Sequence, residues 1–109
     1  MSVSRHGAKA RAYRVPIDHP GVQAVADVLT ESYGRRPYFV GIGGSLPITD
    51  MFLQELKAYT VMVGFGLDDE CVHSPNEFMR LASFERGEAV YVRLLDRLSS
   101  IDPRTIVPR

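Results

Sequence analysis

The sequence predicts an α/β fold with three helices and about two parallel strands. Apolar residues recur at helical spacing in three segments, and two short β-rich apolar runs, residues 38–42 and 59–65, lie between them. Two strands that are joined through a helix are expected to run parallel, with a right-handed crossover. The order helix, strand, helix, strand, helix therefore favours a small parallel sheet covered by helices.

The first helix is expected to begin at "DHPG", with Asp18 or His19 as its cap and Pro20 in its first turn. Proline suits this position because the first backbone amides of a helix have no intrahelical partner. Gly34 is expected to end the helix, since glycine adopts the left-handed conformation that commonly follows a last turn. The residues expected to face the core are Val22, Val25, Val28, Leu29 and Tyr33.

The second and third helices are expected in "ITDMFLQELK" and in the segment that follows "HSPNE". Asn76 is a candidate cap for the third helix, with Glu77 in its first turn. The run 59–65 is almost continuously apolar, which is typical of a strand buried on both faces. The apolar face of the second helix would contain Ile48, Met51, Phe52 and Leu56, and that of the third Leu81, Phe84, Tyr91, Leu94, Leu95 and Leu98.

The 109 residues are enough for one small domain. Residues 1–17 are expected to form an N-terminal arm, residues 18–100 to hold the helices and strands, and residues 101–109, with two prolines, to fray. A parallel pair of strands is rarely stable alone, because buried strands need neighbours and cover on both faces. The pattern therefore predicts part of a larger sheet, whose exposed edges favour dimers or aggregation.

Charge and hydropathy exclude several classes of partner. Thirteen basic and thirteen acidic side chains cancel, so no field gathers nucleic acid and no polybasic run marks an anionic membrane surface. No apolar stretch approaches the roughly 20 residues that span a bilayer. Cys71 is the single cysteine, which excludes an internal disulfide and a zinc site of several thiolates, and favours a reducing, cytoplasmic compartment.

Two polar loops follow the two predicted strands and are the candidate sites. The carboxyl ends of parallel strands meet at one edge of a sheet, where open α/β folds bind ligands. The first loop holds Gly43, Gly44 and Ser45, whose backbone allows close approach of a carboxylate or phosphate near the amino end of the next helix. A tight turn with Ser45 as a helix cap is the alternative explanation of the same residues.

The second loop, "DDECVHSPNEF", places His73 close to three acids. A neutral imidazole is a good zinc ligand, and Asp68, Asp69 and Glu70 are candidates to bind the same ion or to orient the ring. The alternative is a surface loop with one hydrogen-bonded histidine, because no second histidine lies within reach and no H-E-x-x-H motif occurs.

Several motifs occur in the same order as in a known family. The stretches "GIGGSLPIT" and "GFGLDDECVHSPNEFMRLASFERG", with "YRVPIDHPGVQAVADVLTESYGRRP" before them, resemble the C-terminal end of a catalytic domain. The family is that of the zinc aminoacylases, acetylornithine deacetylase, succinyl-diaminopimelate desuccinylase and carnosine-type dipeptidases, and the dipeptidase-like branch is the most similar. The resemblance implies a fragment of a three-layer α/β/α zinc-peptidase domain that hydrolyses amides with the assistance of metal ions.

The same resemblance implies roles for individual residues. His73 corresponds to one ligand of a site that holds two metal ions, usually zinc. Gly43, Gly44 and Ser45 correspond to a turn that contacts the carboxylate of a peptide or N-acyl amino acid substrate. Asp69 and Glu70 match acidic positions of the family's loop, and we expect them to be solvated or to contact a ligand rather than the metal.

The chain departs from that family in the residues that complete the site. It contains no His-x-Asp motif and no Glu-Glu pair, which supply the other ligands and the general base, so no catalytic residue is assigned. Gly41 and Ile42 stand where a common Arg-Glu pair would be, and the lid domain is absent except for a candidate last strand in the arm.

We therefore expect a C-terminal metallopeptidase fragment, from a truncated or split gene, that is inactive alone. One alternative is a subunit of a split enzyme, completed by the missing N-terminal part; the chain could also form a homo-oligomer. Another is a small anion-binding module that needs no metal.

Overall fold

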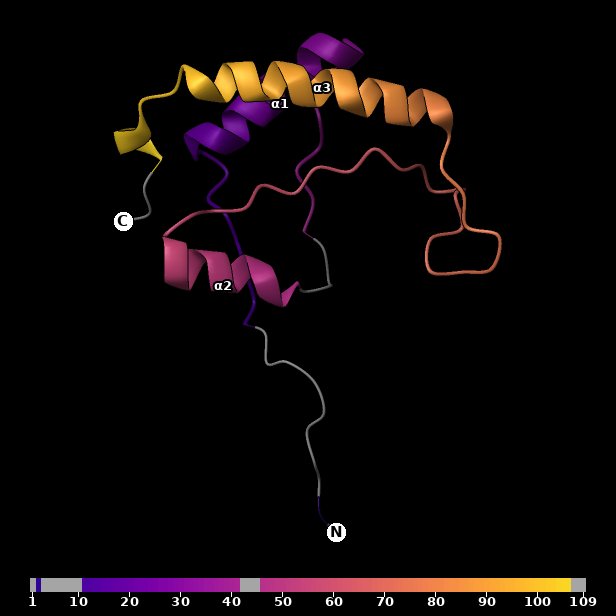
Figure 1. Ribbon diagram of the computed structural model, residues 1–109, viewed down its shortest axis with the longest axis horizontal. Coiled ribbons are helices and arrows are strands. Elements are labelled where there is room, and N and C mark those ends of the chain that lie inside the picture. Colours follow the sequence, from indigo (N-terminus) through magenta and orange to yellow (C-terminus); the bar gives the residue numbers. More distant parts are fainter. Residues whose placement is uncertain (1, 3–10, 42–45, 107–109) are drawn as a thin grey trace.

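The computed structural model describes residues 2, 11–41 and 46–106, and within them the chain consists of helices and extended segments (Figure 1). The helices are α1 (Pro20–Tyr33), α2 (Pro47–Leu56) and α3 (Leu81–Ser99), followed by the short 3-10 helix η1 (Pro103–Thr105). α1 and α3 pack against each other, whereas α2 lies apart from this pair (Figure 1). None of these helices is long and apolar enough to cross a membrane.

The predicted parallel sheet is absent from the described residues, so the prediction of an α/β fold with about two strands is wrong. Residues 38–41 and 59–65 are extended, but within the described part no backbone hydrogen bond joins them. A strand requires a ladder, because an extended segment leaves its amides and carbonyls without partners until a neighbour supplies them. Tyr38 and Val40 are 87% and 73% exposed, and no described residue forms a backbone ladder with this first segment.

The second predicted strand, residues 59–65, packs on one side only. Val61, Val63 and Phe65 contact the helical core, while Met62 between them is 53% exposed. Its first residues are also held, because the Tyr13 hydroxyl donates to the Thr60 carbonyl at 2.9 Å and accepts from the Thr60 amide. The alternation of a strand is therefore present, but the expectation of burial on both faces is wrong.

The core lies between α1 and α3 and is small. Val28 and Val90 are each 1% exposed, and Val25 and Leu94 complete the buried cluster. Gly87 of α3 allows the chain at Phe65 to come close, since a Cβ atom at Gly87 would lie 3.1 Å from the Phe65 ring. At the edge of the core, Arg97 of α3 forms ion pairs with two acids of α1, Asp27 and Glu31.

Both ends of α1 follow their local sequence signals, as predicted. The Nδ1 atom of His19 accepts a hydrogen bond from the Gly21 amide at 3.0 Å, and Pro20 occupies the first turn. Gly34 ends the helix with φ of 69°. The predicted core residues Val22, Val25 and Val28 are buried and Leu29 is partly buried, whereas Tyr33 is 42% exposed, so the helical period identified this face correctly except at its last residue.

The other two helices were predicted in the right segments, although α3 begins later than expected, and their predicted faces are mostly uncovered. All four predicted core residues of α2 are exposed, from 37% for Phe52 to 67% for Leu56. On α3 the buried positions are Gly87, Val90 and Leu94, whereas Phe84 and Leu95 are 60% and 67% exposed. Leu94 was predicted correctly, but the buried stripe also contains Gly87 and Val90, which the predicted face omitted.

Candidate functional site

His73 lies in a closed surface loop that joins the extended segment after Phe65 to α3 (Figure 1). We call residues 71–79 the His73 loop; all of it is exposed, including His73 itself. A turn at its start is closed by the Ser74 amide, which donates to the Cys71 carbonyl at 3.1 Å. The imidazole is thus presented to solvent rather than packed in the interior.

The backbone of this loop is strained. Cys71, His73 and Asn76 have φ values of 56°, 58° and 64°, in the left-handed region. For residues other than glycine this conformation costs roughly 1–2 kcal/mol per residue, although His and Asn adopt it more readily than most. Such a conformation persists only where the surrounding structure holds it, so the contacts at the base of the loop become important.

Glu70 supplies most of these contacts. The residue is 2% exposed, and its carboxylate accepts hydrogen bonds from the Leu67 amide at 3.0 Å and from the Arg80 amide at 3.3 Å. Its own carbonyl accepts from the Phe78 amide at 3.2 Å, so the two ends of the loop are joined through the backbone as well. The Leu67 amide, followed by the backbone and side chain of Arg80, lowers the pKa of the Glu70 carboxyl from its ordinary value of 4.5, against the effect of burial.

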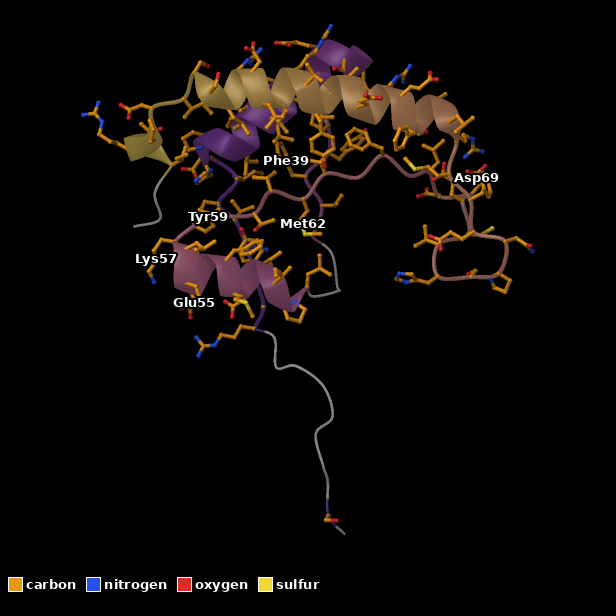
Figure 2. The ribbon with its side chains drawn as sticks, in the orientation of Figure 1. Phe39, Glu55, Lys57, Tyr59, Met62 and Asp69 are labelled. Atoms are coloured by element: carbon orange, nitrogen blue, oxygen red, sulfur yellow. The ribbon has the colours of Figure 1, made fainter. Side chains whose placement is uncertain are left out.

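Arg80 binds both acids at the base of the loop. Its guanidinium donates to the two carboxylate oxygens of Asp69 at 2.8 and 2.6 Å, and to Glu70 Oε1 at 3.2 Å. It also lies over the Phe78 ring, with 5.2 Å from Cζ to the ring centroid. The hydrogen bonds from Arg80 lower the pKa of the Asp69 carboxyl from 3.8. Figure 2 shows Asp69 at the narrow base of the loop.

The third helix begins later than predicted. Asn76 and Glu77 belong to the loop, and α3 starts at Leu81 with Arg80 as its cap residue. The reason is the loop closure, because the Phe78 amide is bonded to the Glu70 carbonyl and the chain is still extended there. The expectation that Asn76 caps this helix is therefore wrong.

The described residues do not fit a complete metal site. They contain no group of three or more His, Cys, Asp or Glu side chains placed to hold one ion. Asp69 and Glu70, two of the acids considered as partners of His73 for a metal, are instead bound by Arg80 and by backbone amides. A catalytic zinc needs about three protein ligands and an open position. In the His73 loop, the His73 imidazole and the exposed Cys71 thiol remain as candidate donors.

The other predicted site residues, Gly43, Gly44 and Ser45, lie outside the described residues. The expectation that they lie beside His73 rested on the parallel sheet, which the described residues do not form. Leu46, the next residue after this turn, is the cap residue of α2 and makes no side-chain capping bond. The sequence analysis did not recognise that Arg80 closes the base of the His73 loop. The only sequence signal of this closure is a pair of acids, Asp69 and Glu70, before the loop and a basic residue, Arg80, after it.

Comparison with known proteins places these observations in one family. Peptidase family M20/M25/M40 matches residues 2–97, which is most of the chain. The chain belongs to this family. The match confirms the family resemblance that the sequence motifs indicated.

The chain is also similar to a curated metallodipeptidase. The chain is 37% identical over 71 residues to the Cys-Gly metallodipeptidase dug1 of Schizosaccharomyces pombe. The matched segment covers 65% of this chain but only 15% of the relative, so most of the dipeptidase has no counterpart in it. No solved structure matches the chain.

Proposed function

We propose that these 109 residues contribute one metal ligand, His73, and one substrate-binding turn, Gly43, Gly44 and Ser45, to a zinc-dependent dipeptidase. The observation that carries the proposal is the loop itself. It presents the imidazole to solvent while the neighbouring acids are held by Arg80 and backbone amides. Neutral imidazole is a common zinc ligand, and an exposed one is accessible to donors from elsewhere.

The remaining ligands and the general base would come from polypeptide outside these residues. The sequence contains neither His-x-Asp nor Glu-Glu, and the described residues hold no cluster of three donors. Exposed apolar surface also supports this view. Tyr38, Val40 and the apolar face of α2 are bare, and large exposed apolar surfaces mark interaction sites. Translation of the DNA immediately upstream of Met1 would show whether an adjacent frame encodes the missing motifs.

The substrate class we propose is a dipeptide, since the Schizosaccharomyces pombe relative is a Cys-Gly metallodipeptidase. In such a substrate the C-terminal carboxylate would meet the backbone amides of the glycine-serine turn at the amino end of α2, where unpaired amides favour an anion. His73 would hold its imidazole nitrogen toward the ion, and the protein outside these residues would position the attacking water.

The first test is an assay of the purified chain with Cys-Gly and N-acyl amino acids in the presence of zinc, cobalt or manganese. We expect no turnover, because one protein ligand does not hold a catalytic ion. A parallel calorimetric titration with zinc should show only weak binding that His73→Ala abolishes. Turnover by the chain alone that disappears in His73→Ala would contradict the claim that the site is incomplete.

A calorimetric titration with small carboxylates separates this proposal from an anion-binding module. A module that uses only Gly43, Gly44 and Ser45 would bind small carboxylates with no metal present and would be indifferent to His73→Ala. We expect no saturable carboxylate binding by the chain alone, since in this proposal the turn acts on a substrate that is also held elsewhere.

A further inference from the structure

We propose that Glu70 and Arg80 are the positioning residues of the His73 loop: together with Asp69 they hold its two ends so that the imidazole is presented in one conformation before any ligand binds. We call these three side chains the Arg80 clamp. The inference deepens the proposed function, because it states how His73 would be preorganised, but its evidence is the loop and not the metal.

The first step of the argument concerns what else holds the loop. Its exposed residues bury no apolar side chain in the core, and three of them have a left-handed backbone. Within the described residues, the hydrogen bonds that connect the chain before the loop to the chain after it all involve Asp69, Glu70 or Arg80. The conformation of the loop therefore depends on this small set of bonds.

The second step concerns the geometry of Glu70. Its two carboxylate oxygens are divided between the two sides of the loop: Oε2 accepts from the Leu67 amide, and Oε1 accepts from the backbone and side chain of Arg80. The Glu70 side chain is 3% exposed, so water does not readily replace a lost partner there. An amide in place of the carboxylate would turn one acceptor into a donor facing another donor.

The third step concerns the guanidinium. Arg80 is the last residue before α3, so its side chain links the loop to the first turn of a helix that belongs to the core. A guanidinium that binds a carboxylate through two parallel hydrogen bonds fixes orientation as well as distance. Lysine at this position would keep the charge but lose that fork.

The test follows backbone amides in the metal-free, ¹⁵N-labelled chain. In Glu70→Gln and in Arg80→Gln we expect faster hydrogen exchange at the backbone amides of residues 67, 78 and 80. The acceleration should be about tenfold or more, because a hydrogen bond to a charged group is lost. Order parameters for residues 71–77 should fall below about 0.6. Amides of α1 and α3 should keep their protection, and Arg80→Lys should restore part of the order.

The matched control is Arg104→Gln. Arg104 also makes a bidentate pair with a neighbouring acid, Asp102, but that pair lies beyond α3 and the Arg104 side chain is 90% exposed. Its loss should leave the His73 loop unchanged. Asp69→Asn serves as a milder second variant, because it weakens the guanidinium pair while leaving every bond of Glu70 in place.

Two results would overturn the proposal. One is an ordered loop in both Glu70→Gln and Arg80→Gln, indistinguishable from Arg104→Gln. The other is a loss of amide protection in α1 and α3 equal to that in the loop, which would make Glu70 and Arg80 general stabilisers of the fold. If Glu70→Gln does not fold, Asp69→Asn and Arg80→Lys decide between a loop-specific and a general role. Because no metal is present in this experiment, turnover by the chain alone that His73→Ala abolishes would refute the proposed function while leaving this result intact.

Discussion

The helix pair α1–α3 and the part of the chain formed by α2 and residues 38–41 have similar apolar content but opposite burial. Val28 and Val90 in the pair are each 1% exposed, whereas Tyr38 and Leu56 are 87% and 67% exposed. The buried residues of the pair are covered because the apolar side chains of α1 and α3 pack against each other. The open part has no such partner within the described residues. The difference shows that hydrophobic sequence specifies where burial is needed, and that a neighbour is required to provide it.

The largest expected effect separates buried from exposed leucines on α3. Leu94→Ala removes a side chain that is 8% exposed, and we expect a loss of about 2–5 kcal/mol in the free energy of unfolding. Its neighbour Leu95 is 67% exposed, and Leu95→Ala should change stability by no more than about 0.5 kcal/mol. Urea unfolding followed by circular dichroism measures both. Equal losses would mean that α3 packs through a different face.

The second effect distinguishes the helix pair from the His73 loop by pH. The carboxyl pKa values of Glu70 and Asp69 are lowered from 4.5 and 3.8, so their contribution to loop order is complete above those values. It is lost progressively as the pH falls below them toward the lowered pKa values. Order parameters measured from neutral to acidic pH should show the loop loosening while the apolar core of the pair persists. Loop order that does not change with pH would count against the clamp.

A third, smaller effect tests how residues 59–65 sit on α3. Gly87→Ala should strengthen the helix by about 1 kcal/mol, but its Cβ atom would lie 3.1 Å from the Phe65 ring. We expect these contributions nearly to cancel, while the nuclear Overhauser contact between Phe65 and Tyr91, whose centroids are 5.8 Å apart, weakens. Gly64→Ala, which meets no atom within 4 Å, is the control. An unchanged contact in Gly87→Ala would show that the segment does not press on α3.

The smallest effect on stability is expected on α2. Met51 is 55% exposed, so Met51→Glu should alter the free energy of unfolding by no more than about 0.5 kcal/mol. It should nevertheless reduce the self-association that we predict for the chain, because a charge in an exposed apolar face opposes its burial against another molecule. Analytical ultracentrifugation at several concentrations measures this. Met51→Glu that destabilises the helix pair would show that α2 is part of the same core.

The features predicted correctly from the sequence are those with local causes. His19, Pro20 and Gly34 set the ends of α1 through backbone geometry that needs no distant partner. The strands were predicted wrongly because their ladder depends on a neighbour that neither segment encodes. Residues 59–65 keep the alternation of a strand and still form no ladder in the described structure.

The site was predictable only in outline. The sequence motif singled out His73, and the position of Gly43, Gly44 and Ser45 stays a prediction. The burial of Glu70 could not be predicted, because an acid is seldom buried and its partners, Leu67 and Arg80, lie on opposite sides of a closed loop. Spacing along the chain does not reveal such a closure.

The most direct test of the central claim, that His73 is one ligand of a site completed by other polypeptide, is a chimaera. The segment of the Schizosaccharomyces pombe Cys-Gly metallodipeptidase that aligns with this chain is replaced by the matching residues of this chain. We predict that the chimaera hydrolyses Cys-Gly, that Cys71→Ser keeps the activity, and that His73→Ala loses more than the roughly 10–100-fold that removal of an outer partner costs. A folded His73→Ala chimaera with undiminished turnover would contradict the account.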